Sequence, residues 1–349
     1  MSIKLTLLTT AALLAYSNAS FAAGQAHNHA EMLKNQKQTA HAHNAYEPLN
    51  VIGTHTHGKN EWMLSYSYMH MEMSGIRKGT DGASVNDVYA SSYMSAPLSM
   101  KTDMHMLGGM YGINNDFTFM AMVPYVEKSM DMRTQAGVKF TTKSSGFGDV
   151  KVSIIDSLAR YNLSKWSATY SLSLPTGSID KSDSTPTASN IRLGYPMQLG
   201  SGTFDFTPTL TYADSCGCHN NIHFGAQAYG TFRINDNSKN YRLGNRFGLK
   251  TWLGKTFSEE VSAGITLDAV HESEISGKDS SWNAMMAPGT NTTNSGYEKA
   301  TAGFDISYKP KSVKRLKLSA GYTAPIYQDV NGYQTDSDHM FTLNVRKAF

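Results

Sequence analysis

Residues 62–72 read WMLSYSYMHME and alternate with a period of two. Trp62, Leu64 and Tyr66 stand at even positions, with serine or methionine between them. Successive side chains of a β-strand point to opposite faces, so this stretch predicts a strand with one apolar, aromatic face. The same period recurs as far as residue 345 and gives twelve such segments. Each has about the 9–11 residues of a tilted membrane strand.

The connections between these segments also alternate in length. Short ones are predicted near 113–116, 161–165, 214–220, 254–259 and 310–314. Longer ones follow at 74–98, 134–146, 175–201, 276–298 and 326–337, with a short exception at 235–239. Bacterial outer-membrane barrels have short periplasmic turns and long extracellular loops. The pattern therefore predicts an all-β fold, a transmembrane up-and-down antiparallel β-barrel of about twelve strands, in the outer membrane of a Gram-negative bacterium. A secreted β-sandwich is the alternative, but it would show fewer aromatic side chains at outward positions.

The composition excludes several other classes of protein. Charged residues make up 17% of the 349 residues, and the net charge is +3 without a basic block, so no nucleic acid is expected as a partner. The mature chain has no apolar run of about 18 residues, which excludes helical membrane spans. It also lacks a nucleophile elbow, a phosphate loop and an HExxH motif, so we expect no enzymatic activity.

Both ends of the chain carry targeting information. Residues 1–22 have the form of a secretory signal peptide, in which Lys4 precedes an apolar run and cleavage is expected after Ala22. At the other end, Phe349 and the alternating apolar residues before it resemble the C-terminal signal of outer-membrane proteins. The barrel-assembly machinery that reads this signal, and the lipid of the outer membrane, are therefore expected partners.

Residues 23–60 differ in composition from the barrel region, which we assign to 61–349. They contain few apolar residues, and this predicts a disordered, His-rich periplasmic tail. Imidazoles two residues apart can chelate Cu or Zn on a flexible chain. The candidate ligands form three His-x-His pairs: His27 and His29, His41 and His43, His55 and His57. A soluble polar tail without metal is the alternative interpretation, and no cofactor is required.

A second candidate metal site lies in a predicted periplasmic turn. Cys216, Cys218 and His219 bring two thiols and an imidazole together, and these are soft metal ligands. A disulfide between the two cysteines is equally compatible with an oxidising compartment. The sequence leaves both alternatives open.

Three short motifs resemble those of a known family. Residues 146–150 read GFGDV, residues 172–178 read LSLPTGS, and residues 198–203 read QLGSGT. In this order and spacing they are similar to an outer-membrane family of barrel porins named after the meta-pathway of phenol degradation. The resemblance implies a single-chain barrel with a transport role, and it supplies no catalytic residues.

The predicted lumen is rich in methionine. Thirteen of the nineteen methionines lie between residues 63 and 132, and parity directs most of them inward. The expected lumen-lining residues are Met69, Met71, Met104, Met106, Met120 and Met122, together with Arg242, Arg246, Asp268 and Glu272. The methionines have three interpretations: flexible packing, an apolar surface for small solutes, or a thioether track for Cu(I) or Ag(I). We expect Met110 opposite Met120 and Met100 opposite Met130. We also expect Arg246 close to Asp268, and Arg242 close to Glu272.

The sequence thus predicts an outer-membrane channel for a small solute. Small apolar or aromatic molecules are the leading solute class, because of the family resemblance. Handling of copper or another transition metal through Met and His is the first alternative. A structural or adhesive barrel without transport is the second.

Overall fold

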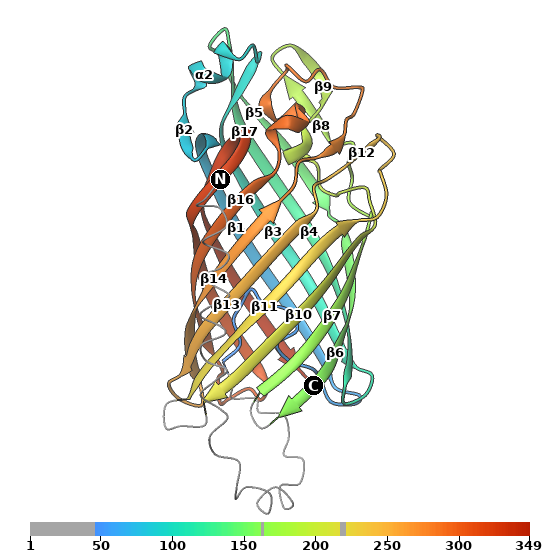
Figure 1. Cartoon of the computed structure of the whole chain (residues 1–349), viewed down its shortest axis with the longest axis vertical. Helices are drawn as coiled ribbons and strands as arrows, with labels where there is room; N and C mark the ends of the chain where they lie inside the picture. The colour runs from blue at the N-terminus through green and yellow to red at the C-terminus, as the bar shows by residue number, and fades with distance from the viewer. Residues whose placement is uncertain (1–45, 162–163, 217–220) are drawn as a thin grey trace, which may run out of the picture. The chain divides into compact units, whose positions relative to one another are not determined.

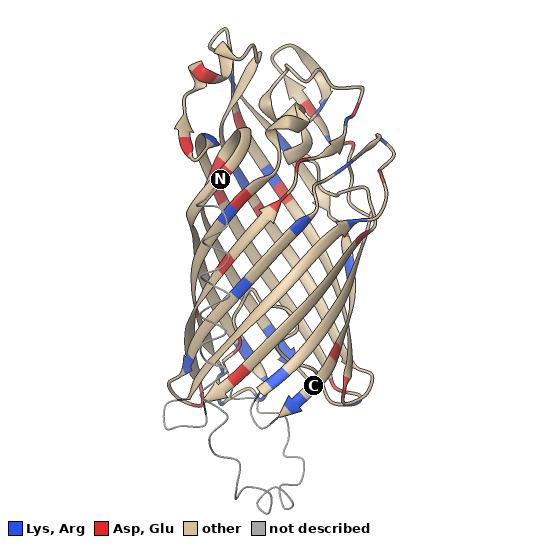
Figure 2. Cartoon of the chain, viewed as in Figure 1, with Lys and Arg blue, Asp and Glu red and all other residues tan. Residues whose placement is uncertain are grey.

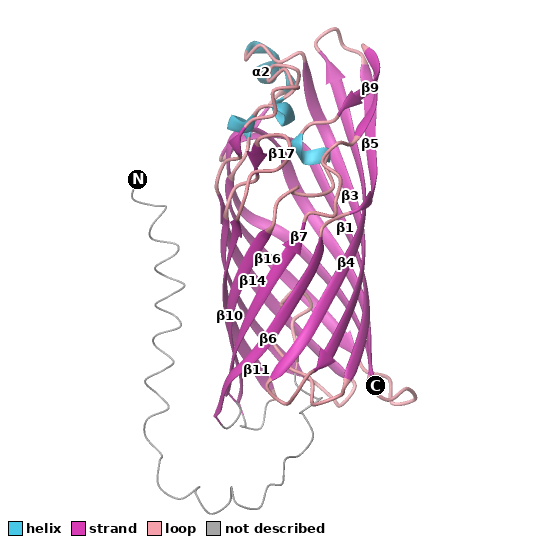
Figure 3. Ribbon diagram, turned by 90° about the vertical axis from the view of Figure 1, so that its right-hand side faces the viewer, coloured by secondary structure: helices cyan, strands magenta, loops and turns pink. Residues whose placement is uncertain are grey.

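A computed structural model describes residues 46–161, 164–216 and 221–349. These residues form a closed β-barrel (Figures 1 and 3). Around the ring, all neighbours pair antiparallel and β17 pairs back with β1. The ring contains β1 (Trp62–Gly79), β3 (Ser95–Gly112), β4 (Phe117–Thr134), β6 (Val150–Tyr161), β7 (Ser164–Leu174), β10 (Asp205–Cys216), β11 (Ile222–Arg233), β13 (Arg246–Thr256), β14 (Val261–Glu272), β16 (Tyr297–Tyr308) and β17 (Leu316–Ala348).

The long element β17 contains two of the strands that close the barrel. Its first part, up to Val330, pairs with β16, and its second part pairs with β1. A fully antiparallel ring needs an even number of strands. The chain therefore reverses direction within β17, at Asn331 and Gly332, where Gly332 has a φ of +61°. Ten further ring elements plus these two segments make twelve strands, and the predicted fold is confirmed.

The short elements belong to the loops or extend the long strands. They are β2 (Asp81–Ala83), α2 (Val85–Ala90), β5 (Lys139–Phe147), β8 (Ser182–Thr185), β9 (Ala188–Arg192), η2 (Tyr195–Met197), β12 (Tyr241–Arg242), β15 (Ser276–Gly277), η3 (Pro288–Thr290) and η4 (Thr292–Asn294). The predicted loop at 134–146 is wrong for most of its length, because β4 and β5 form a hairpin there. This hairpin lies above the apolar belt, where both faces can be polar and the alternation that marks a membrane strand is lost.

The outer wall of the barrel carries an apolar belt. Nine aromatic side chains that the period-two alternation predicts to point outward are all 37–54% exposed: Trp62, Tyr66, Phe117, Phe119, Trp166, Phe204, Phe206, Phe304 and Tyr322. Charged residues are frequent in the upper loops and at the lower rim in Figure 2. The belt and the closed sheet place the protein in the outer membrane of a Gram-negative bacterium. None of the described helices is long and apolar enough to cross a membrane.

Candidate transport path through the barrel

Methionine side chains from β1, β3 and β4 meet inside the barrel. A three-residue loop at Asn114–Asp116 sets the register, so that Met110 lies opposite Met120 and Met100 opposite Met130, as predicted. The buried residues Met63, Met110, Met120, Met122 and Ile155 form one cluster towards the periplasmic end. A second cluster towards the extracellular end contains Met100, Met130, Met132, Leu193, Met197 and Ala287.

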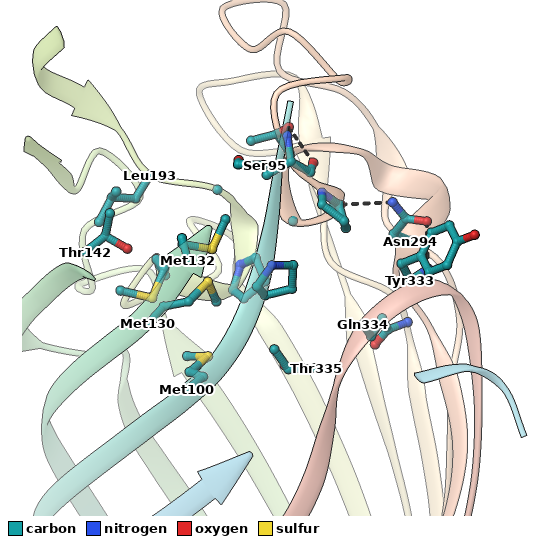
Figure 4. Close-up of a pocket in the computed structure, with 18 of the residues that line it drawn as sticks. Ser95, Met100, Met130, Met132, Thr142, Leu193, Asn294, Tyr333, Gln334 and Thr335 are labelled. Atoms are coloured by element: carbon teal, nitrogen blue, oxygen red, sulfur yellow. Dashed lines mark hydrogen bonds between the residues drawn. The ribbon is translucent and has the colours of Figure 1, made fainter. Parts of the chain in front are cut away.

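The extracellular cluster lines a large apolar cavity, which we call the upper cavity. Its volume is about 800 Å³. Figure 4 shows Met100, Met130 and Met132 grouped on one side, with Asn294 and Tyr333 on the other. Flexible thioethers can adapt to ligands of different shape, and they make favourable contacts with aromatic rings.

Two further cavities continue from the upper cavity into the barrel, with volumes of about 660 Å³ and 290 Å³. Arg246 and Tyr297 line all three, so the cavities adjoin one another. Of the expected lumen residues, Met71 lines the upper and the smallest cavity, and Asp268 the smallest. Met104, Met106, Met122 and Glu272 line the cavity of 660 Å³. Met120 is buried in the periplasmic cluster, and Met69 pairs with Met104 across β1 and β3.

The charged residues of β13 and β14 form a ladder, but its register differs from the prediction. Arg246 pairs with Glu272, with 2.7 Å between Arg246 Nε and Glu272 Oε2. Lys250 Nζ lies 3.5 Å from Asp268. The expected pairs are wrong by four residues, because the turn is closed by a hydrogen bond from the Phe257 amide to the Val261 carbonyl. An even shift keeps these side chains on the same face.

Arg242 does not line the lumen, contrary to the prediction. It belongs to β12 in an extracellular loop, and its guanidinium lies 3.1 Å from the Asp236 carboxylate. The strand that we expected to include it begins only at Arg246. Alternation alone could not locate that boundary, because Tyr241 and Leu243 continue the apolar pattern beyond it.

The three family motifs meet at the side chain of Asp149. Its carboxylate accepts hydrogen bonds from the amides of Gly177 (2.9 Å) and Ser201 (2.8 Å) and from the Ser201 hydroxyl (2.9 Å). A Cβ atom at Gly200 would lie 2.5 Å from the Gly177 carbonyl oxygen, so glycine is required for this approach. Asp149 directly precedes β6, so these hydrogen bonds connect both ends of the 175–201 loop to the start of that strand.

The tied loop then contacts strands and loops around the lumen. Lys128 on β4 donates hydrogen bonds to the carbonyls of Pro196 (2.7 Å) and Gln198 (2.6 Å). The Ser144 hydroxyl donates to the carbonyl of Met197 (2.7 Å), which places this methionine in the extracellular cluster. A Cβ atom at Gly194 would lie 2.6 Å from the Gly289 carbonyl oxygen, so this loop and the loop that carries η3 are in close contact.

The periplasmic end of the lumen is occupied by residues 46–60, which we call the N-terminal plug. Its backbone carbonyls accept hydrogen bonds from β7, β11 and β13: Ser167 to Gly53 (2.6 Å), Gln227 to Ile52 (2.5 Å) and Lys250 to Asn50 (3.1 Å). The His57 amide donates to Thr118 on β4 (2.8 Å). The plug therefore contacts strands around the ring, and Figures 1 and 3 show it inside the lower barrel.

This arrangement corrects our expectation of a disordered tail as far as residue 60. Tyr46 is 3% exposed, and its hydroxyl donates a 2.6 Å hydrogen bond to Asp305 on β16. Its ring packs over Gly254 and Gly264, where a side chain on either strand would collide with it. These two glycines leave the space that the Tyr46 ring fills. Residues 23–45, the rest of the predicted tail, lie outside the described part of the chain.

Charges hold the plug at Glu47. Its carboxylate lies 3.0 Å from Arg346, 3.6 Å from Lys317 and 3.3 Å from His55. Burial alone would raise the pKa of Glu47, but the charges of Lys317 and Arg346, and of His55 when it is protonated, hold it well below its usual range. Burial lowers the pKa of His55 to about 4. His55 is therefore neutral at pH 7, and its contact with Glu47 is not an ion pair.

The predicted metal ligands are only partly within the described residues. His27, His29, His41, His43, Cys218 and His219 lie outside them, whereas His55 and His57 belong to the plug, with ring centroids 5.1 Å apart. Cys216 is disulfide-bonded. Within the described ranges, no three His, Cys, Asp or Glu side chains are placed to hold a metal ion. Metal binding by the tail stays a prediction.

Comparisons with known proteins identify the family of the chain. The chain belongs to the family described as "Putative MetA-pathway of phenol degradation", whose model matches residues 79–324. It is similar to the COG4313 outer membrane channel from Pseudomonas putida F1, with 12% identity and a TM-score of 0.58 over 89% of this chain and 100% of that one. A Pseudomonas aeruginosa FadL homologue matches with 10% identity and a TM-score of 0.40, over 83% of this chain and 90% of that one. No curated protein sequence matches the chain.

Proposed function

We propose that the barrel carries small apolar or aromatic molecules across the outer membrane. The observation that carries the proposal is the upper cavity, whose volume of about 800 Å³ falls in the range of roughly 300–1,000 Å³ typical of small-molecule sites. Its position at the extracellular end and its methionine wall suit the capture of a solute with few hydrogen-bonding groups. Membership of an outer-membrane barrel family supports a channel.

The proposal is tested by current block in planar bilayers that contain the purified protein. Phenol added on the extracellular side should interrupt the ionic current as it occupies the lumen. Met132→Glu places a charge in the upper cavity and should weaken the block by at least about tenfold, since burial of an unpaired charge is unfavourable. Met63→Glu in the periplasmic cluster is the matched control for a charge at a buried methionine. A current that phenol leaves unchanged would contradict the proposal and favour a structural barrel.

Copper handling is the second candidate, and the clustering of lumen thioethers is the observation that favours it. Met100, Met130, Met132 and Met197 share one buried cluster, and thioethers are soft ligands for Cu(I). Replacement of methionine by leucine separates the two candidates, because leucine keeps the apolar surface and removes the sulfur. If phenol still blocks the ionic current after this replacement, the result favours transport of apolar molecules. Loss of Cu(I) or Ag(I) binding with it favours metal handling.

A further inference from the structure

The cations that line the path outnumber the carboxylates. The upper cavity is lined by Lys128, Arg192, Arg246 and Lys299, and no Asp or Glu is among its described lining residues. The two arginines already have partners, since Arg192 pairs with Asp180 and Asp279, and Arg246 pairs with Glu272. The two lysines therefore supply the unmatched positive charge of this apolar cavity.

The same excess continues below the upper cavity. Lys151 lines the cavity of 660 Å³ together with Arg233, which is paired with Asp205. Within the described residues, none of Lys128, Lys151 and Lys299 has a carboxylate within 4.0 Å. Lys299 donates a hydrogen bond of 2.6 Å to the Ser337 hydroxyl, and Lys128 donates to the two loop carbonyls.

The remaining carboxylates along the path, Asp149 and Asp305, take their hydrogen bonds from neutral donors, and Asp305 Oδ1 has no hydrogen-bond partner among the described residues. Asp149 accepts its three hydrogen bonds from Gly177 and Ser201, and Asp305 accepts one from Tyr46. Within the described residues, neither carboxylate forms an ion pair with one of the three lysines. A partly desolvated ammonium group without a counter-charge attracts an anion, and cavity walls of low dielectric constant strengthen that attraction.

From this arrangement we propose that the preferred solute has an apolar or aromatic body and a single anionic group, such as a carboxylate. This inference rests on the proposed function and narrows its solute class. The body would contact the methionines of the upper cavity, and the anionic group would bind Lys128 or Lys299. Lys299 also lines the smallest cavity and Lys128 the cavity of 660 Å³, where Lys151 offers the next cation. The same charges repel a free metal cation.

The wild-type protein gives the first test, with benzoate and benzyl alcohol as probes of similar size and different charge. Benzoate should block the current in planar bilayers at a concentration at least about tenfold lower than benzyl alcohol, a difference of about 1.4 kcal/mol in binding free energy. The reversal potential in a KCl gradient should show anion selectivity. Equal block by both probes, or cation selectivity, would overturn the inference and leave the proposed function intact. Block by neither probe would overturn the proposed function itself.

Variants then assign the preference to the lysines. Lys128→Met, Lys151→Met and Lys299→Met, singly and together, should weaken block by benzoate and leave block by benzyl alcohol unchanged, whereas Lys299→Arg should keep the benzoate block. Lys101→Met is the matched control, since this lysine side chain is 58% exposed and pairs with Glu72. An unchanged benzoate block in the triple variant, which lacks all three lysines, overturns the assignment. Heat-dependent migration in gels checks that each variant barrel has folded. The comparison of benzoate with benzyl alcohol uses the wild-type protein, so it does not depend on the folding of any variant.

Discussion

The two ends of the lumen are filled by residues of different chemical character. At the extracellular end, methionines and an inward loop surround an apolar cavity, and the loop is tied by hydrogen bonds at Asp149 and Lys128. At the periplasmic end, the plug is held by charges at Glu47, and small polar residues such as Thr118, Thr169 and Thr211 are fully buried around it. An apolar solute can occupy the first end without hydrogen bonds. It can pass the second only if the plug moves, because the plug occupies the lumen there and is hydrogen-bonded to β4, β7, β11 and β13.

Deletion of residues 46–57 should have the largest effect and would remove the difference between the two ends. The lumen loses the backbone that contacts β7, β11 and β13, so single-channel conductance should rise severalfold. Residues 58–60 are kept because Asn60 pairs with Gly112 at the end of β3. Deletion of residues 30–41, also twelve residues, is the control and should leave conductance near that of the wild type. Equal conductance in the two deletions would show that the plug does not restrict the path.

Glu47→Gln should loosen the plug without removing it. Arg346 and Lys317 then lose their shared counter-charge, and breaking one side of a buried ion pair costs about 3–5 kcal/mol. We expect frequent openings to a higher conductance level in single-channel records. Glu259→Gln is the matched control, because that side chain is 77% exposed in a periplasmic turn. If the records of Glu47→Gln match those of the wild type, the ion pairs of Glu47 do not hold the plug in place.

The two ends of the lumen also differ in how well the sequence predicted them. Period-two alternation is local, and it placed the outward aromatics and the inward methionines correctly. The register after β13 depends on which amide of the turn bonds to which carbonyl, and the sequence does not show this. The predicted charge ladder was therefore wrong by four residues, although its side chains were assigned to the correct face of the sheet. The plug was missed because it has no periodicity and its partners are far away in sequence. Tyr46 and Asp305, for example, are 259 residues apart.

The unmatched lysines could not have been recognised from the sequence either. Unlike Lys250, Lys151 and Lys299 have no carboxylate directly across the strand pair. Asp149 stands in the GFGDV motif, so the sequence did indicate that it is important. Its role as a hydrogen-bond acceptor could be recognised only once the structure placed the two other motifs beside it. Local patterns thus predict which way a side chain faces, whereas its charge partners depend on register and on loops.

Acid should weaken the periplasmic end and leave the extracellular end unchanged. His55 faces Glu47, Arg346, Lys317 and His57, and its pKa falls from 6.5 when exposed to about 4 in the docked plug. The released plug therefore binds more protons than the docked plug between these values, so docking is strongest above pH 6.5 and weakens as the pH falls towards 4. Glu47 stays ionised across this window, because its pKa is well below 4.5.

This pH effect is measured as the frequency of plug openings in bilayers between pH 7.5 and pH 4.5. His55→Asn should remove most of the dependence, since it leaves no imidazole to be protonated on release. His271→Asn is the control, because that side chain is 51% exposed on β14. A pH dependence that persists unchanged in His55→Asn would assign the effect to another group.

The smallest effect is expected from leucine at lumen methionines of β3 and β4, and it tests whether the path below the upper cavity needs sulfur. We would replace Met104, Met106, Met120 and Met122 together, because they come from the facing strands β3 and β4. Leucine keeps the volume, each change should cost less than about 1.5 kcal/mol, and the barrel should assemble normally. If the lumen serves apolar or aromatic solutes, block by phenol should change by less than about twofold, and copper tolerance of the cells should stay as in the wild type. If the thioethers bind Cu(I), the copper-dependent phenotype should disappear while block by phenol remains. Because the unmatched lysines already oppose a free cation in the same path, we expect the first of these two results.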